Sequence, residues 1–433
     1  MKRTSESKDA PSQASLDRRG FLRAGASLAG GLVLAGTAGA GEAAAAQESN
    51  LPPNVPEWMK TLGASVEAAP YGMPSKYEKD VIRRNVPFLT ATTESSVSFT
   101  PLQDLDGIIT PNGLCFVRDH GGTPTIDPVQ HRLMIHGLVD RPMIYTMADL
   151  MRFPSESHVY FLECAANGGM DWKGAQMQGV QFSHGMVHCC EWTGVKLSVL
   201  MNEVGVAPKA KWLLAEGADA AAMTRSIPIE KALDDALVAW SQNGERLRPE
   251  NGYPLRLIVP GWQGNVNVKW LRRLKFGEEP WETREETSKY TELMADGKAL
   301  QFTWAMQAKS VITHPCPEKP MAGKGFCEVS GLAWSGMGKI ARVDVSFDGG
   351  VTWQGAKLQE PVHTKSLTRF RIPWEWNGET ALIQSRATDE TGYVQPTITE
   401  LRAAWGANAI YHKNSIHTWR VNPNGTVDNV QVS

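Results

Sequence analysis

The sequence contains little that would favour a disulfide-stapled scaffold, a membrane-spanning chain or a nucleic-acid-binding protein. Only 6 of its 433 residues are cysteine, too few for a cysteine-stapled fold of this length. No uninterrupted apolar stretch reaches the roughly 20 residues that span a bilayer. The 44 basic and 46 acidic residues leave a net charge of -2 and no excess of positive charge to neutralise phosphates. Nucleic-acid binding is therefore not expected as the main role.

The first residues have the pattern of an export signal. The pair Arg18-Arg19 precedes a weakly apolar run, rich in glycine and alanine, from Ala24 to Gly41. This pattern predicts a twin-arginine signal peptide over residues 1–46 and localisation in the periplasm. A membrane anchor is the alternative, but the glycines make the run a poor span. Proteins exported by this route are already folded, which points to a cofactor inserted in the cytoplasm.

The rest of the chain divides into four parts by its composition and its pattern of apolar residues. We expect an extended arm at 47–99, a mixed α/β domain at 100–287, a connector at 288–308 and an all-β domain at 309–433. In the second part, residues 131–137 and 253–261 are expected to be strands, and 197–204 a helix that ends at Gly205. Neither GxGxxG nor GxxxxGK occurs in the sequence, so a nucleotide-binding fold has no support.

The part from Lys309 onward alternates short strands with tight turns. Asp348-Gly349-Gly350 and Asn377-Gly378 have hairpin-turn chemistry. The expected strands are 326–334, 339–347, 352–358, 368–373 and 381–388. Strands at this spacing predict an immunoglobulin-like sandwich, so the fold class of the whole chain is α+β. Such a module commonly carries an interface, and dimerisation is its expected role.

The six cysteines fall into different settings. There is no CxxCH, which excludes covalent c-type haem in this chain, and no paired CxxC for zinc or an iron-sulfur cluster. Cys316 and Cys327 lie in a proline-rich segment, and either a disulfide or two free thiols fits them. Apolar surroundings predict that Cys115, Cys189 and Cys190 are buried in the core.

Cys164 differs from the other cysteines. It follows the apolar strand Val159–Leu162 and opens a turn of small residues, Ala165-Ala166-Asn167-Gly168-Gly169. Such a turn lets the backbone approach a cofactor closely, although a buried structural thiol would have the same pattern.

Several segments resemble the sulfite oxidase family of molybdenum-pterin oxidoreductases. The similarity extends over residues 100–420 and is carried by Phe116–His120, Leu162–Asn167, Glu191–Val195, Gly252–Leu274 and Val343–Trp353. The last of these segments is similar to the family's dimerisation domain. Within the family, this chain, with an export signal and without a haem motif, most resembles the molybdenum subunits of sulfane dehydrogenases.

The resemblance implies one molybdenum-molybdopterin cofactor per chain, with the Cys164 thiolate as the metal ligand. It implies that Arg118 and Tyr290 are catalytic, although a connector tyrosine packed on the sandwich would match the Tyr290 spacing equally well. The implied cofactor-binding residues are Phe116, Val117, Arg118, His120, Cys164, Asp219, Asn251, Arg256, Asn267, Val268 and Lys269. Two cations suit a phosphate, and a carboxylate suits the N–H donors of a pterin.

Three positions depart from the family pattern. Asn251 replaces a pterin-binding histidine, Gly169 replaces a second substrate-binding arginine, and Phe182 replaces a pocket tryptophan. With less charge and bulk, we expect a site open to a substrate larger than free sulfite. The expected substrate is a persulfide on the cysteine of a sulfur-carrier protein, oxidised towards sulfonate or sulfate. Free sulfite is the alternative.

The resemblance also implies partners. Because the chain has no haem motif, a c-type cytochrome subunit is expected to accept the electrons, in a heterotetramer that contains a homodimer of this chain. A methionine sulfoxide reductase would lack the C-terminal sandwich. A non-enzymatic scaffold would not need to keep Cys164, Arg118, His120, Arg256 and Lys269 together.

Overall fold

The computed structural model describes residues 55–432 apart from 66, 87, 88 and 407, so the expected signal peptide lies outside the described residues. Residues up to Ser75 and residues from Lys76 form two separate units. The first contains one 3-10 turn, Glu57–Met59, and most of its described side chains are exposed. Among the described residues, no helix has the length and apolarity to cross a membrane.

The α/β part of the second unit contains three sheets. The smallest is antiparallel and consists of β1 (Arg84–Asn85), β2 (Val97–Phe99) and β3 (Val117–Arg118). The second has the order β11 (Glu245–Arg246), β10 (Leu237–Gln242), β7 (Val187–Lys196), β6 (Glu156–Glu163), with β12 (Arg256–Ile258) also paired to β10. The third has the order β5 (Met143–Tyr145), β4 (Leu133–Gly137), β13 (Leu271–Gly277), β8 (Trp212–Gly217), β9 (Thr224–Pro228).

Short helices connect these strands. They are α3 (Met147–Leu150), α4 (Val180–His184), α5 (Leu197–Val204), α6 (Ile229–Asp234) and α7 (Arg284–Thr287). Helix α5 has the predicted bounds because its apolar residues recur at helical spacing and are buried in a core that includes residues of the second and third sheets. It ends at Gly205, whose φ of 64° suits glycine, and an added Cβ would lie 2.5 Å from Asp140 Oδ2.

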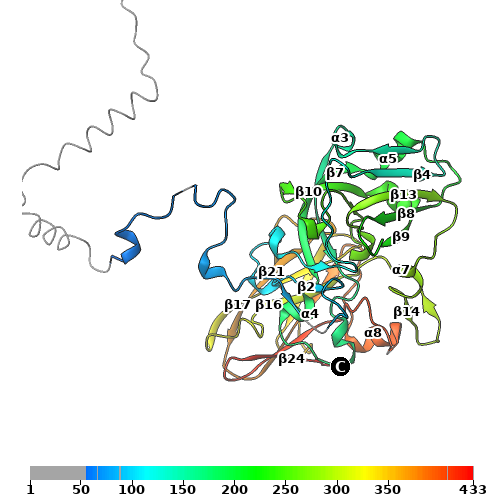
Figure 1. Ribbon diagram of the computed structural model, residues 1–433. Coiled ribbons are helices and arrows are strands. Elements are labelled where there is room, and N and C mark those ends of the chain that lie inside the picture. Colours follow the sequence, from blue (N-terminus) through cyan, green and yellow to red (C-terminus); the bar gives the residue numbers. More distant parts are fainter. Residues whose placement is uncertain (1–54, 66, 87–88, 407, 433) are drawn as a thin grey trace, which may run out of the picture. The chain divides into compact units, whose positions relative to one another are not determined.

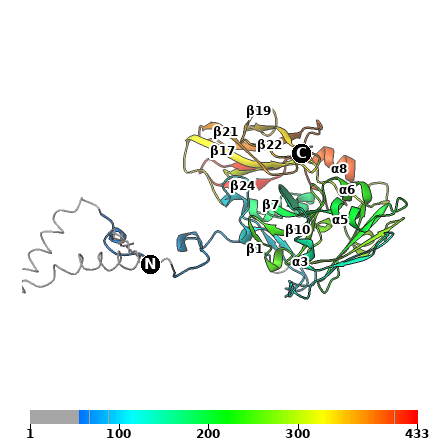
Figure 2. The ribbon, with the colours of Figure 1, turned by 90° about the horizontal axis from the view of Figure 1, so that it is seen from above.

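The C-terminal part is the predicted sandwich of two sheets. One has the order β16 (Lys309–His314), β17 (Gly325–Trp334), β21 (Thr368–Trp376), β20 (Lys357–Leu358). The other has the order β19 (Gln354–Gly355), β18 (Ile340–Ser346), β22 (Ala381–Asp389), β23 (Thr418–Val421), β24 (Val427–Val430). Helix α8 (Ile398–Trp405) lies between β22 and β23 in the chain, and a β14–β15 hairpin (Glu292–Leu293, Ala299–Leu300) precedes the sandwich. Figures 1 and 2 show the α/β part and the sandwich of the second unit side by side.

Two sequence expectations differ from the structure. The strand expected at 253–261 is reduced to β12, because prolines at 254 and 260 cannot donate to a ladder. The strand expected at 352–358 is divided: β19 pairs with β18, whereas β20 pairs with β21 of the other sheet. The other expected sandwich strands form within a few residues of their predicted bounds.

A buried ion pair connects the two parts at the end of β6. Lys309 Nζ, from β16, lies 3.0 Å from Glu163 Oε1, and both side chains are almost fully buried. Trp334 Nε1 donates to Glu163 Oε2 at 2.7 Å, and Asn167 Nδ2 donates to Oε1 at 2.9 Å. Lys309 also donates to the Asn167 carbonyl at 2.8 Å. The two charges are therefore compensated by hydrogen bonds, which a buried pair needs.

Replacing Lys309 should strongly destabilise the protein. In Lys309→Met the Glu163 carboxylate is left buried without its cation, which costs about 3–5 kcal/mol of unfolding free energy. The matched control is Lys319→Met, which removes a more exposed pair with Asp104 and should cost under about 1 kcal/mol. Denaturant unfolding checks both variants, and equal losses would contradict the assigned role of the buried pair.

Candidate active site

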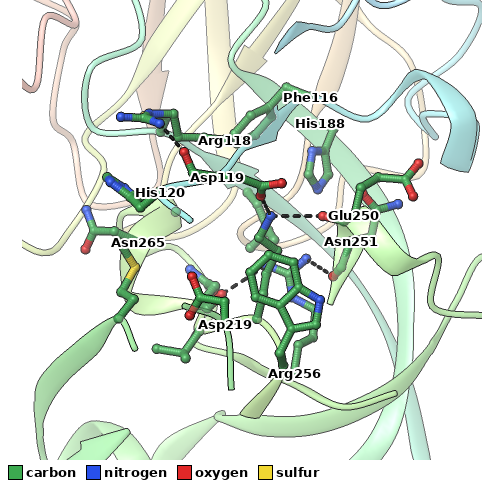
Figure 3. A pocket seen from close by; sticks show the side chains of 18 of the residues that line it. Phe116, Arg118, Asp119, His120, His188, Asp219, Glu250, Asn251, Arg256 and Asn265 are labelled. Carbon is green, nitrogen blue, oxygen red and sulfur yellow. Dashed lines mark hydrogen bonds and ion pairs between the residues drawn. The ribbon is translucent and has the colours of Figure 1, made fainter. Parts of the chain in front are cut away.

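One cavity of about 730 Å³, its mouth included, gathers most of the predicted site residues. Figure 3 shows side chains from segments far apart in the sequence pointing into it, with Arg118 and His120 on one side and Asp219 and Arg256 on another. Its walls come from the β3 segment, the end of β6, strand β7, the loop after β8 and residues 250–270.

Cys164 reaches the cavity from the turn that follows β6. Its backbone N–H donates to Met186 O at 2.9 Å, and its carbonyl accepts from Asn167 N at 2.9 Å. Asn167 Oδ1 accepts from Met186 N at 3.1 Å, so the turn is tied to the start of β7. Burial raises the pKa of the Cys164 thiol. A bound metal ion would supply the charge that favours the thiolate.

Two cations, Lys269 and Arg256, line the cavity, and Lys269 is paired with the Asp119 carboxylate. Lys269 Nζ donates to Asp119 Oδ1 and, at 2.9 Å, to Glu250 O. Arg256 is buried and donates to the carbonyls of Asn251 at 2.8 Å and Asn267 at 3.0 Å. Burial lowers the pKa of Arg256 to about 10, so it remains charged at neutral pH.

Five polar atoms of the cavity lining are buried without a protein partner. They are His188 Nδ1 and Nε2, Asp219 Oδ1, Arg256 Nε and Asn265 Oδ1. Because unpartnered buried polar atoms cost free energy, this set indicates a ligand with both donors and acceptors. A pterin with a phosphate group fits: the cations suit the phosphate, Asp219 suits pterin N–H groups, and Cys164 suits a soft metal.

Arg118, His120 and Tyr290 form the side of the cavity next to the connector. The Tyr290 hydroxyl lies 3.1 Å from His120 Nε2, and Arg225 lies over the Tyr290 ring. Burial, then the charge of Arg118, lowers the pKa of His120 to about 4, so its imidazole is neutral. Burial also raises the pKa of Tyr290, which stays protonated. The structure thus places Tyr290 in the cavity, although its catalytic role stays a prediction.

A loop of the sandwich covers the Cys164 turn. Glu292 accepts from the backbone N–H groups of Ile410 and Tyr411, and His412 N donates to Ala165 O at 2.8 Å. A Cβ added at Gly169 would lie 2.6 Å from the Ile410 carbonyl oxygen. The expectation that Gly169 opens the mouth is therefore wrong at this position, because the loop occupies that space.

The predicted site residues converge with one exception. Val117 lines a neighbouring groove instead of the cavity, while its neighbours Phe116 and Arg118 line the cavity itself. The predicted residues in the lining are Phe116, Arg118, His120, Cys164, Asp219, Asn251, Arg256, Asn267, Val268, Lys269 and Tyr290. Phe182 is absent from this lining and instead packs edge-on against Phe99, with ring centroids 5.5 Å apart.

Other lining residues were missed by sequence reasoning. They include Asp119, His188, Met223, Glu250, Asn265 and Trp270. Asp119 lies between the predicted residues Arg118 and His120, so its carboxylate could have been predicted from the sequence as part of the site. His188 carried no such signal, because it precedes two cysteines interpreted as core.

Comparisons with known proteins agree with this geometry. The family model described as an oxidoreductase molybdopterin binding domain matches residues 120–285, and the Mo-co oxidoreductase dimerisation domain matches residues 300–419. Mouse mitochondrial sulfite oxidase is 30% identical over 366 residues, which is 78% of this chain and 65% of that protein. The tomato (Solanum lycopersicum) NADH nitrate reductase is 32% identical over 330 residues, 67% of this chain and 36% of that protein.

A solved structure is more similar. The sulfane dehydrogenase SoxCD from Paracoccus pantotrophus has 52% sequence identity and a TM-score of 0.87, covering 88% of this chain and 98% of that chain. Fold and site define a molybdopterin oxidoreductase with an attached dimerisation domain. Within that class, the chain belongs to the sulfite oxidase family, which confirms the resemblance and the cofactor predicted from the sequence.

The cavity cations should control how much cofactor the protein retains. Arg256→Met removes a buried guanidinium from the phosphate side, so we expect molybdenum content to fall at least about tenfold. Molybdenum analysis of the folded, purified chain checks this. Arg369→Met is the matched control, because Arg369 is equally buried but donates to Leu105 and Gly107 carbonyls away from the cavity. An Arg256→Met protein with full molybdenum would contradict the assignment.

The loop over the Cys164 turn should make the protein sensitive to acid through His412. Burial lowers the pKa of His412 to about 4, whereas an unfolded histidine titrates near 6.5. The unfolded chain therefore takes up a proton first as the pH falls from 6.5 to 4, and stability is lost over that window. At pH 5 this loss is about 2 kcal/mol for His412.

Replacing His412 should remove that part of the acid sensitivity. In His412→Gln the difference in unfolding free energy between pH 7 and pH 5 should shrink by about 2 kcal/mol. His363→Gln, at a partly exposed position in the sandwich, is the control and should leave the difference unchanged. Denaturant unfolding at the two pH values measures this difference. An unchanged difference in His412→Gln would show that His412 does not cause the acid sensitivity.

Proposed function

We propose that this chain is a periplasmic molybdenum oxidoreductase that oxidises sulfane sulfur. The substrate is a persulfide on a cysteine of a carrier protein, the product is a sulfonate or sulfate, and a c-type cytochrome accepts the electrons. The observation that carries the proposal is the cavity that joins Cys164, Arg118 and the two cations in a chain 52% identical to a sulfane dehydrogenase. The paired arginines Arg18-Arg19 support export.

The chain's own residues divide the work of the site. When bound, the molybdenum cofactor would supply one oxygen atom, taken from water, and accept two electrons in each round, so conversion of a persulfide to a sulfonate takes three rounds and delivers six electrons to the cytochrome. Lys269 and Arg256 bind its phosphate, Asp219 accepts from its N–H donors, and Cys164 ligates the metal. The Glu163–Lys309 pair holds the turn that presents Cys164, so the ligand reaches the cavity in one fixed position.

The substrate side depends on Arg118. Its guanidinium stabilises negative charge that develops on oxygen bound to sulfur. Tyr290, protonated and within hydrogen-bond distance of neutral His120, places its hydroxyl in the same region. The Tyr411 ring packs against the Tyr290 ring, with ring centroids 5.3 Å apart.

This composition supports a carrier-bound persulfide over free sulfite. Sulfite is a small anion that is bound best by several cations. Lys269 and Arg256 are assigned to the cofactor phosphate, which leaves Arg118 among the cations of the cavity lining for the substrate. A single cation suits the terminal sulfur of a persulfide, which carries less charge than sulfite. The sulfite oxidase relatives favour free sulfite as the alternative substrate.

Rates with the two substrates test the proposal. The exported chain, purified with its cytochrome partner, should oxidise a carrier persulfide faster than it oxidises free sulfite. Arg118→Met should lower kcat/KM for the persulfide by about 10²–10³ while keeping molybdenum. Fast turnover of sulfite with no turnover of the persulfide would contradict the proposed substrate. Full activity of the single chain without any cytochrome would contradict the proposed acceptor.

The assembly is the last part of the proposal. The chain ends in a dimerisation-type domain, which supports a homodimer within a heterotetramer that also holds the cytochrome subunits. Since the sequence has no CxxCH, the electrons must leave through another subunit.

A further inference from the structure

Three potential metal ligands meet at the back wall of the cavity, apart from Cys164. They are Cys115, His188 and Cys190, whose ligand atoms all lie within 4.8 Å of one another, and all three residues are buried. The two sulfurs are 3.4 Å apart. For comparison, two sulfurs bound at about 2.3 Å to one tetrahedral zinc ion are roughly 3.8 Å apart.

The fold brings these residues together from two segments. His188 and Cys190 are two positions apart on β7, so their side chains point to the same face of the sheet. Cys115 follows a 3-10 turn (Asn112–Leu114) and lies three residues before Arg118. Cys189 points to the opposite face, where its sulfur lies 3.2 Å from Ser366 Oγ.

His188 needs two partners that the chain does not supply. Its imidazole is 3% exposed, and neither ring nitrogen has a hydrogen-bond partner. Because His188 also lines the cavity, one nitrogen can meet the cofactor. The other remains for the sulfur side, and a metal-bound histidine commonly uses its second nitrogen in this way.

The two sulfurs have one donor and two acceptors around them, and a bound cation would supply the charge that favours thiolates. Gln242 Nε2 lies 3.2 Å from Cys115 Sγ and 3.1 Å from Cys190 Sγ, so one amide group donates to both sulfurs. The Thr110 carbonyl lies 3.6 Å from Cys190 Sγ and 3.9 Å from Cys115 Sγ, where it accepts from the thiols before a metal binds. The Pro111 carbonyl, 3.6 Å from Cys115 Sγ, is a further acceptor for that thiol.

We propose that Cys115, Cys190 and His188 bind a soft d¹⁰ cation, Zn²⁺ or Cu⁺, as a second metal site behind the cofactor cavity. Thiolate and imidazole are the ligands that these ions prefer. Binding releases the two thiol protons to solvent and moves no electrons. The site ties the segment that carries Phe116 and Arg118 to β7, so the cation stiffens the back wall of the cavity.

Metal analysis of the full holoprotein tests this site. The wild-type chain should hold about one zinc or copper ion in addition to molybdenum, and measuring both elements identifies which cation it is. Cys115→Ser/Cys190→Ser should lower that second metal at least about tenfold. Cys189→Ser is the matched control, because its sulfur faces away, and it should keep the second metal. Cys164→Ser should lose molybdenum and keep the second metal, which separates the two sites.

Measurements on the wild-type chain keep the proposal testable even where the double variant does not fold. Peptide mass spectrometry after alkylation and digestion of the denatured chain should show Cys115 and Cys190 as two free thiols that react with alkylating agent once the metal is chelated. A Cys115–Cys190 disulfide, seen as a linked pair of peptides, would overturn the proposal. So would a wild-type chain that holds neither zinc nor copper, or equal second-metal content in wild type and a folded double variant.

Discussion

The buried ion pair between Glu163 and Lys309 is the interaction on which the rest of the structure depends. Glu163 is the last residue of β6 and immediately precedes Cys164, while Lys309 is the first residue of the sandwich strand β16. Two opposite charges in a low-dielectric interior must stay together, because either one alone carries a large desolvation penalty. The pair therefore fixes the Cys164 turn relative to the sandwich, and the sandwich becomes part of the active site.

The same dependence explains the composition of the cavity. Its cations and carboxylates come from the α/β part, whereas the sandwich loop that contains Tyr411 and His412 contacts the Cys164 turn and the Tyr290 ring. Cys164 is only 8% exposed beneath these contacts, and charge interactions are stronger where water is excluded. In this arrangement a dimerisation-type module also shapes the site where the substrate must react.

The sequence was most informative where local patterns decide local structure. Helix 197–204 and its stop at Gly205 follow from apolar spacing and from glycine's freedom at positive φ. The sandwich strands follow from alternation and turn residues, whereas residues 352–358 were expected as one strand because alternation does not report which sheet a strand joins. Cys164 stood out by its small-residue turn, but its role needed the family resemblance.

The sequence by itself determined the residue types and their order: a thiol on a tight turn, an arginine before it, and paired cations after it. Only the tertiary structure decided which of them meet. Cys115 and Cys190 are 75 positions apart, and the Ile410 carbonyl fills the space over Gly169 from the far end of the chain. Periodicity records the geometry of neighbours along the chain, whereas such contacts depend on how loops and sheets pack against one another.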